Sequence, residues 1–278
     1  MTLPAPATSV NWWPPDIRQR IFDGHQCRLL RAQITAEKDG VLSGMARAKE
    51  LAAKTRVSFD SNLTDGDQVS AGKVVATLTG TPFYIVRAEE LLLGELSKTS
   101  GIATQARQAL EGADGRFLVV CGAFKKMPHA IKDQIRQAVA HGGLRMRMAP
   151  HPFVYVDKNY VRILGGVAGA MKAVAPLERP VVIQLRGELE PIAQEAVTAA
   201  RMGAATLMVD TGELDDLKAA SQALRQEGLR ERVKLAFAGN LRLTDLPGLA
   251  GHDVDAVDIG YSVVDAPCLP MRFDVIKD

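Results

Sequence analysis

The chain has 278 residues, of which 47% are hydrophobic and 24% charged, so it can bury one large core or two ordinary ones. Its 34 Lys and Arg residues nearly balance its 32 Asp and Glu residues, leaving a formal net charge of +2. This balance excludes a bulk attraction to nucleic acid or to an anionic membrane, so any anion site must be local. We find no basic and apolar leader pattern and no uninterrupted apolar run of about 18 residues, and therefore expect neither an export signal nor a membrane span.

The cysteines Cys27, Cys121 and Cys268 are far apart and lack metal-ligand spacing. Unpaired thiols of this kind fit a reduced compartment, and we expect a cytoplasmic protein. At the N-terminus, Trp12-Trp13-Pro14-Pro15 favours an extended arm that docks on a partner surface, because proline disfavours helix and exposed indoles seek contacts.

The first third of the chain has mixed α/β order. Alternating apolar residues at 28–36 and 69–78 predict strands, and residues 46–53 between them predict a helix. Residues 65–75 have the pattern of turn, short strand, turn and second strand, and they resemble the hammerhead turn of lipoyl and biotinyl domains. A carrier domain would display a lysine at a hairpin tip, whereas Lys73 begins a strand, so a scaffold role is favoured.

A helix is predicted at residues 89–109 from the spacing of its apolar residues. Ser100-Gly101 lies in its middle. A glycine there indicates either a break in the helix or close packing of another segment against it.

From residue 117 the pattern changes to apolar runs of strand length, which alternate with amphipathic helices. Runs this apolar suit parallel strands covered on both faces, and their spacing of roughly 23 to 36 residues is that of a strand and helix unit. No Gly-x-Gly-x-x-Gly fingerprint occurs, so an open α/β barrel of about six or seven strands is favoured over a dinucleotide-binding sheet. The strands are expected at 117–121, 153–156, 181–185, 206–209, 233–237 and 256–259, and the helices at 130–140, 191–202 and 214–226.

In such a barrel the chemistry sits where the strands end. Lys125 and Lys126 follow the first strand, and Arg145 and Arg147 would point to one side if their segment is extended. Four converging cations suit a polyanion such as a phosphorylated sugar. The alternative is an ordinary solvated charge cluster.

Other strand ends carry an acid and glycine turns. Asp210 ends the run 206–209 and is either functional or the N-cap of the helix beginning near Glu213. Ala238-Gly239-Asn240 and Gly260-Tyr261 end the last two strands, where bare backbone amides can hold a phosphate, although glycine turns are common in other roles.

These motifs, in this order, resemble nicotinate-nucleotide pyrophosphorylase (carboxylating), also called quinolinate phosphoribosyltransferase. The similarity covers roughly residues 25–276. It rests on Gly40-Val41-Leu42-Ser43-Gly44, Asp65-Gly66-Asp67 with Gly72, Ala88-Glu89, Ser100-Gly101-Ile102-Ala103-Thr104, Lys125 before Pro128, Gly142-Gly143 before Arg147, Asp210, Gly239 and Gly260.

The resemblance implies an N-terminal α/β sandwich domain, residues 1–110 completed by 266–278, and an open α/β barrel domain at 111–265. It implies a homodimer, or a higher homo-oligomer, whose sites borrow groups from the neighbouring subunit. The reaction would join phosphoribosyl pyrophosphate to a pyridine dicarboxylate with Mg²⁺, releasing pyrophosphate and carbon dioxide. Developing charge on the departing pyrophosphate would have to be neutralised by metal and cations.

Carried over by position, the resemblance implies roles for individual residues. Lys125 and Asp210 would be catalytic, with Asp210 also facing the metal. Ala238, Gly239, Asn240, Gly260 and Tyr261 would bind phosphate. The substrate contacts would be Phe124, Lys126, Arg145, Met146, Arg147, Lys158 and Gln184.

The chain departs from the family pattern at several of these positions. Phe124 replaces an arginine, Met146 a histidine and Glu90 an arginine, while Gln184 stands where a glutamate is expected. Each lost charge-assisted hydrogen bond is worth about 1.5 to 3 kcal/mol, so an acceptor less anionic than quinolinate is indicated.

Three hypotheses follow. The first is a divergent phosphoribosyltransferase acting on a pyridine carboxylate or related aromatic acid. The second is a non-catalytic or repurposed homologue that binds a phosphorylated ligand or a protein partner. The third is different chemistry at the same strand ends, as in relatives found with molybdate transport.

Overall fold

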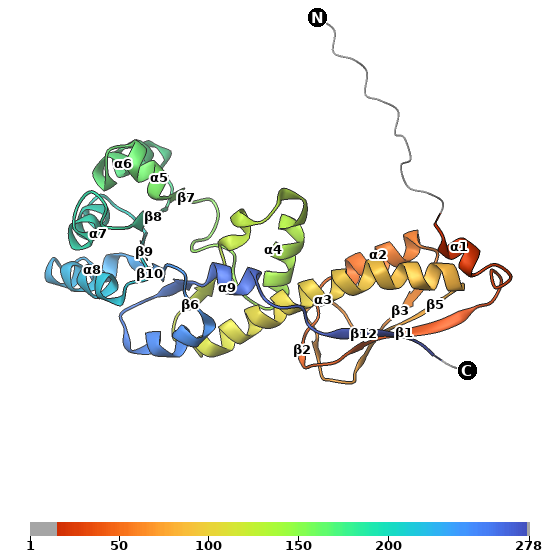
Figure 1. Ribbon diagram of the computed structural model, residues 1–278. Coiled ribbons are helices and arrows are strands. Elements are labelled where there is room, and N and C mark those ends of the chain that lie inside the picture. The colour runs from red at the N-terminus through yellow and green to blue at the C-terminus, as the bar shows by residue number, and fades with distance from the viewer. Residues whose placement is uncertain (1–15, 277–278) are drawn as a thin grey trace, which may run out of the picture.

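A computed structural model describes residues 16–276, which form two lobes joined by one long helix, α3 (Pro82–Ala113). Figure 1 shows the N-terminal lobe at one end of α3 and the barrel lobe at the other. The predicted arm around Trp12-Trp13 lies outside the described residues. No helix among residues 16–276 is long and apolar enough to cross a membrane.

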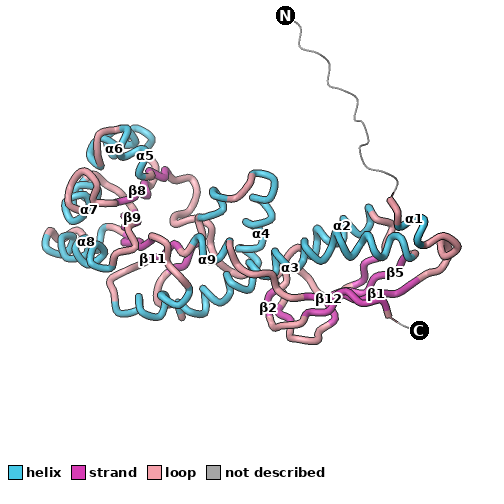
Figure 2. The backbone as a smooth tube through the Cα atoms, in the orientation of Figure 1, coloured by secondary structure: helices cyan, strands magenta, loops and turns pink. Residues whose placement is uncertain are grey.

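The N-terminal lobe is a four-stranded antiparallel sheet in the order β12-β1-β5-β3, with helices packed on one face (Figure 2). Buried side chains such as Ile34 and Leu78 on the sheet meet Ala48 and Leu92 on the helices in one apolar core. The elements here are α1 (Arg18–Ile21), β1 (Leu30–Ala36), β2 (Gly40–Val41), α2 (Met45–Lys54), β3 (Ser58–Asp60), β4 (Gln68–Val69), β5 (Val74–Gly80) and β12 (Met271–Val275).

The predicted strand, turn, strand pattern at residues 65–75 is present as β4, a turn and β5. β4 pairs with β2, and the Lys73 carbonyl accepts the Ala36 N–H at the end of β1. The segment is thus part of the sheet scaffold. The predicted strand at residues 28–36 begins two residues later, at Leu30.

Helix α3 runs without interruption past Ser100-Gly101, so of the two predicted possibilities the close packing is correct. A Cβ atom at residue 101 would lie 1.9 Å from the carbonyl oxygen of Pro267 and 3.0 Å from the Leu269 amide nitrogen. Leu269 N–H donates to the Ser97 carbonyl of α3 over 2.8 Å. Glycine lets the returning chain lie directly on the helix and continue into β12, which pairs with β1.

The barrel lobe contains a six-stranded parallel sheet in the order β6-β11-β10-β9-β8-β7. Among the described residues β6 and β7 form the two edges and do not pair, so the barrel is open between them, as predicted. Every predicted strand is present, within two residues at either end. The strands are β6 (Leu118–Val120), β7 (Val154–Val156), β8 (Val181–Leu185), β9 (Thr206–Asp210), β10 (Lys234–Ala238) and β11 (Ala256–Asp258).

Helices surround the outside of this sheet (Figure 1). The predicted helices appear as α4, α7 and α8, whereas the pair α5 and α6 after β7 was not predicted from the sequence. The α-helices are α4 (Lys132–His141), α5 (Lys158–Ile163), α6 (Val167–Val174), α7 (Ile192–Arg201), α8 (Leu214–Gln226) and α9 (Gly260–Val264). Short 3-10 turns are η1 (Ala123–Lys126), η2 (His129–Ile131), η3 (Ala175–Leu177), η4 (Arg230–Arg232) and η5 (Leu243–Gly251).

Alternate strand residues supply two separate cores. Ile183, Leu207 and Leu235 belong to the core between sheet and helices, whereas their neighbours Val182 and Met208 belong to a smaller cluster inside the barrel. Because side chains alternate along a strand, the residue two positions after an inner-core residue faces the same way. It lies at the open end of the barrel.

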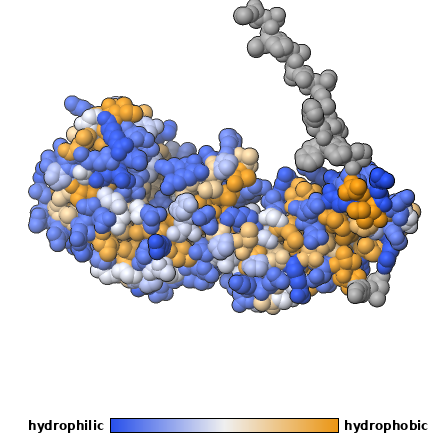
Figure 3. Space-filling model, viewed as in Figure 1, coloured by the Kyte–Doolittle hydropathy of each residue, from blue (hydrophilic) through white to orange (hydrophobic). Residues whose placement is uncertain are grey.

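On the surface, polar and apolar side chains are interspersed (Figure 3). An apolar patch gathers at α1, where Ile17, Ile21 and Leu29 are exposed. Patches of this kind on an outer element mark contact surfaces, although nothing in the described residues covers this one.

The Gly101 contact yields a stability prediction. Gly101→Ala places a methyl group against the Pro267 carbonyl, so we expect a loss of about 2 to 4 kcal/mol in the free energy of unfolding, measured by urea denaturation. Gly94→Ala is the matched control, because it lies on the same helix and its added methyl group would have no neighbouring atom within 4 Å. There the better helix propensity should raise stability by about 0.5 to 1 kcal/mol. Equal effects of the two substitutions would contradict the close approach.

Candidate active site

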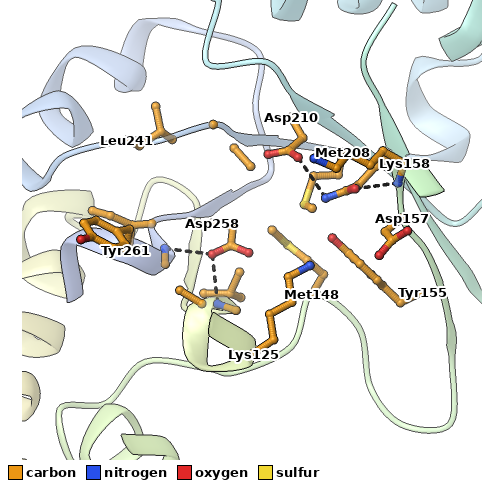
Figure 4. A pocket seen from close by; sticks show the side chains of 18 of the residues that line it. Lys125, Met148, Tyr155, Asp157, Lys158, Met208, Asp210, Leu241, Asp258 and Tyr261 are labelled. Carbon is orange, nitrogen blue, oxygen red and sulfur yellow. Dashed lines mark hydrogen bonds between the residues drawn. The ribbon is translucent and has the colours of Figure 1, made fainter. Parts of the chain in front are cut away.

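A pocket of about 740 Å³ opens at the carboxyl ends of the barrel strands (Figure 4). Its lining comes from every strand of the sheet or from the loop that follows it. The predicted site residues in the lining are Lys125, Lys126, Met146, Arg147, Lys158, Gln184, Asp210, Ala238, Gly239, Asn240, Gly260 and Tyr261.

Polar residues enter the pocket directly above the inner core. Asp210 lies two residues after Met208, and Asp258 two residues after Ala256, so each follows an inner-core residue on the same face of its strand. The parallel register sets Asp210 opposite Ala238, and Ala238 opposite Asp258. The two carboxylates therefore stand on either side of a small residue.

Asp258 was missed by the sequence analysis. Its Oδ1 accepts the backbone N–H groups of Gly122 and Gly260, each over 3.0 Å. Burial raises the pKa of the Asp258 carboxyl, against the lowering effect of these two hydrogen bonds. The signal that could have found it is its place two residues after the inward-facing Ala256.

The same contact corrects the prediction for Gly260. Its N–H is committed to the Asp258 carboxylate, so it is not available to a phosphate, and an anion already stands at that point. Gly239 adopts a φ of +120°, and a Cβ atom there would lie 2.2 Å from the Gly212 nitrogen. That close backbone approach explains why a glycine follows β10.

Asp210 belongs to a side-chain network with Gln184 and Arg186. Gln184 Nε2 donates to Asp210 Oδ2 over 3.0 Å, and an Arg186 terminal nitrogen donates to the same oxygen over 3.1 Å. The N-cap of α8 is Glu213, so the alternative interpretation of Asp210 as a helix cap is wrong. Arg186 was missed by the sequence analysis, although its place directly after the predicted strand 181–185 is a signal that could have found it.

The cations Lys125 and Lys126 lie on η1, directly after β6. Lys125 Nζ is 5.8 Å from the centre of the Tyr155 ring, and Lys126 Nζ is 5.8 Å from that of Tyr261. Burial and neighbouring carboxylates raise the pKa of the Tyr155 hydroxyl, which stays protonated near neutral pH.

Arg147 lines the pocket but Arg145 does not, so the prediction that both point to one side is wrong. The Arg145 carbonyl accepts the Cys121 N–H beside β6, and the chain bends at Met146, which ends the alternation on which that prediction depended. The side chain of Phe124 lies outside the described part of the chain, so its predicted contact is not placed.

Apolar side chains form the remaining wall of the pocket. Met146, Met148, Met208, Phe153 and Leu241 line it beside Tyr155. Polarizable thioethers and aromatic rings of this kind suit a flat, apolar ligand face.

The residues present do not fit a Mg²⁺ ion held by Asp210. Within residues 16–276 no group of three or more His, Cys, Asp or Glu side chains could hold a metal ion. At the predicted site, one Asp210 oxygen already accepts two donors and Gln184 presents its amide nitrogen.

Comparison with known proteins identifies the family. The family model for the N-terminal domain of quinolinate phosphoribosyl transferase matches residues 16–100. The family model for the C-terminal domain matches residues 102–274. The chain belongs to the quinolinate phosphoribosyl transferase family. Members of this family are phosphoribosyltransferases.

Relatives of known name agree with this assignment. The chain is 28% identical over 250 residues to the "Probable nicotinate-nucleotide pyrophosphorylase (carboxylating)" of Archaeoglobus fulgidus, covering 89% of this chain and 95% of that protein. It is 26% identical to the human nicotinate-nucleotide pyrophosphorylase (carboxylating), covering 86% and 80% of the two chains.

Solved structures share the fold of the family. The crystal structure of NadC from Streptococcus pyogenes superposes with a TM-score of 0.77 at 22% identity, over 95% of this chain and 92% of that one. Nicotinate-nucleotide pyrophosphorylase from Pyrococcus furiosus superposes with a TM-score of 0.78 at 22% identity, over 93% and 72%.

The buried Asp258 yields a pH prediction. Because burial raises its pKa, the charged form of Asp258 is less favourable in the folded than in the unfolded protein. The stability that the carboxyl contributes at low pH is therefore lost as the pH rises through the folded pKa. Asp258→Asn keeps an acceptor oxygen for Gly122 and Gly260 and removes the charge. We expect a higher melting temperature than wild type at pH 8, with the difference shrinking as pH falls toward 4.

Asp265→Asn, at an exposed carboxyl just after α9, is the control and should show no such pH-dependent difference. Thermal unfolding followed by circular dichroism across this pH range checks both variants. A constant difference between Asp258→Asn and wild type would contradict the raised pKa.

Proposed function

We propose that this protein transfers a phosphoribosyl group from phosphoribosyl pyrophosphate to a pyridine carboxylate or a related aromatic acid. The observation that carries the proposal is the composition of the pocket. Lys125, Lys126, Arg147 and Lys158 line it together with a wall of methionine and aromatic side chains. Cations suit the phosphates, and the apolar wall suits an aromatic ring.

The transfer makes one bond and breaks one. The acceptor's ring nitrogen supplies an electron pair to the anomeric carbon of the ribose, while the bond from that carbon to pyrophosphate breaks and its electrons leave with the pyrophosphate. Positive charge builds on the ribosyl centre and negative charge on the leaving group. Groups that neutralise the leaving group lower the barrier.

Lys125 and Lys126 are suited to the leaving group. Both follow β6 on η1 as exposed residues that line the pocket, and in the described part of the chain neither makes a salt bridge to a carboxylate. Burial raises the pKa of Asp258, and the positive charge of Lys125 acts against that increase. Tyr155 and Tyr261 hold the two ammonium groups over their rings, which keeps these cations oriented into the site.

The acceptor we propose carries a single carboxylate. On the wall around Met146, the side chains of Met148, Met208 and Phe153 offer no charged donor. A second ring carboxylate facing this wall would lose its hydration without gaining charge-assisted hydrogen bonds. We therefore place an aromatic monocarboxylate ahead of a dicarboxylate, and with it a transfer that does not require decarboxylation.

A second candidate is binding of a phosphorylated ligand without transfer. It is favoured by one observation: Gln184 and Arg186 both donate to Asp210 Oδ2, so that oxygen is already engaged with the protein. In either case we propose a homodimer, in which a neighbouring N-terminal lobe would complete the open side of the pocket.

Calorimetric titration with phosphoribosyl pyrophosphate, with and without Mg²⁺, tests the first proposal. We expect saturable binding with a dissociation constant below about 1 mM, equivalent to about 4 kcal/mol. No heat at millimolar ligand would reject the transferase. Binding without any release of pyrophosphate, measured across a panel of pyridine mono- and dicarboxylates, would favour the second candidate.

Lys125→Ala tests the role of that lysine. Loss of a cation at the leaving group should lower kcat by about a hundredfold or more while the melting temperature stays unchanged, since the side chain is exposed. Lys172→Ala removes an exposed lysine from α6, away from the pocket, and should leave kcat unaltered. Undiminished pyrophosphate release by Lys125→Ala would remove this residue from the mechanism.

A further inference from the structure

We infer that Arg186 is a built-in counter-cation for Asp210, and that together with Gln184 it takes the carboxylate out of use as a ligand for a divalent metal ion. The inference deepens the proposed function, and its bearing on catalysis rests on that function. Any divalent ion the reaction uses would then be carried by the pyrophosphate group and would not be bound by Asp210.

The orientation of Gln184 is the first step. Its Oε1 lies 2.9 Å from the backbone nitrogen of Lys158, and a backbone N–H can only donate. The atom facing Lys158 must therefore be the amide oxygen, which leaves the amide nitrogen facing Asp210 Oδ2 at 3.0 Å (Figure 4). The lone pair of an amide nitrogen is delocalised into the carbonyl and does not bind a metal, and its N–H hydrogens carry partial positive charge. This end of the side chain therefore disfavours a cation where a carboxylate would bind one.

Arg186 supplies the charge that neutralises Asp210. One terminal nitrogen of its guanidinium donates both to the Asp210 carboxylate, over 3.1 Å, and to the Asp210 carbonyl oxygen, over 2.6 Å. A guanidinium stays protonated throughout the accessible pH range. The pair is half-buried, so the charge of Asp210 is balanced within the protein before any ligand arrives.

Neighbouring side chains hold Arg186 in place. Glu195 Oε2 accepts the backbone N–H groups of Arg186 and Gly187, over 3.0 and 2.9 Å. On the other side, the Glu188 carboxylate accepts a hydrogen bond from Arg186 Nε over 3.2 Å. The same carboxylate accepts two hydrogen bonds from Arg162, each over 2.7 Å. Hydrogen bonds thus hold both the backbone and the side chain of Arg186. Moving the guanidinium away from Asp210 would require more than one of these hydrogen bonds to break.

These contacts conflict with a metal at the same acid. Mg²⁺ is bound through one or two protein carboxylates together with substrate phosphates, and it requires oxygen ligands at close range. A fixed guanidinium beside the only carboxylate of this group adds repulsion, while the amide nitrogen of Gln184 removes the second ligand. Arg186 also lines the pocket, so the same cation faces an anionic ligand.

Titration of the free protein with Mn²⁺, without any phosphate ligand, tests the inference apart from the proposed function. For wild type we expect no saturable binding that depends on Asp210, as judged by comparison with Asp210→Asn. The Gln184→Glu/Arg186→Leu double variant restores a second carboxylate and removes the cation. It should gain one Mn²⁺ site, tighter than in wild type by roughly tenfold or more, or about 1.4 kcal/mol.

Arg162→Leu is the matched control, because it removes an arginine from Glu188 without touching Asp210, and it should gain no metal site. One-to-one Mn²⁺ binding to wild type that Asp210→Asn abolishes would overturn the inference. So would a folded double variant that still fails to bind Mn²⁺. If the double variant does not fold, the comparison of wild type with Asp210→Asn decides alone.

Discussion

The parallel register of the barrel strands is the constraint on which the site depends. Side chains alternate along each strand, so Val182 and Met208 face the interior and pack with Ala236. Two residues later the same face reaches the open end. There Gln184, Asp210 and Asp258 replace apolar side chains. The register sets Asp210 and Asp258 on either side of Ala238, and Gln184, which is opposite Met208, reaches Asp210 through its side chain. Apolar packing below thus positions the polar groups above.

Charge is balanced locally among these polar groups. Asp258 is held by two backbone N–H groups and faces Lys125, whereas Asp210 is held by Gln184 and Arg186. Lys126 on η1 and Lys158 after β7 also line the pocket, and in the described part of the chain neither makes a salt bridge to a carboxylate. The acids of the pocket are thus neutralised, and its cations on η1 are exposed. Such a pocket suits an anion whose charged end stays near solvent and whose apolar face lies against the methionines.

Helix α3 connects this site to the N-terminal lobe. Its first half packs in the core of that lobe, and its second half, from Ile102 onward, packs in the core of the barrel. The last strand returns across Gly101 to pair with β1. One continuous helix therefore contributes to both cores. The predicted division into domains at residue 110 falls inside this helix and stays a prediction.

The sequence by itself determined the fold class and the strands of the barrel. Apolar runs and their spacing predicted all six strands of the barrel, because strands covered on both faces need nearly continuous apolar residues. It also indicated Lys125, Lys126 and Asp210 by their place at strand ends, and Arg147 by its spacing from Arg145. The tertiary structure alone decided which neighbours these residues have: that Arg145 turns away, that Gly260 serves Asp258, and that Arg186 reaches Asp210. Such contacts join residues from different strands, and their geometry depends on register and loop conformation, which no local pattern in the chain encodes.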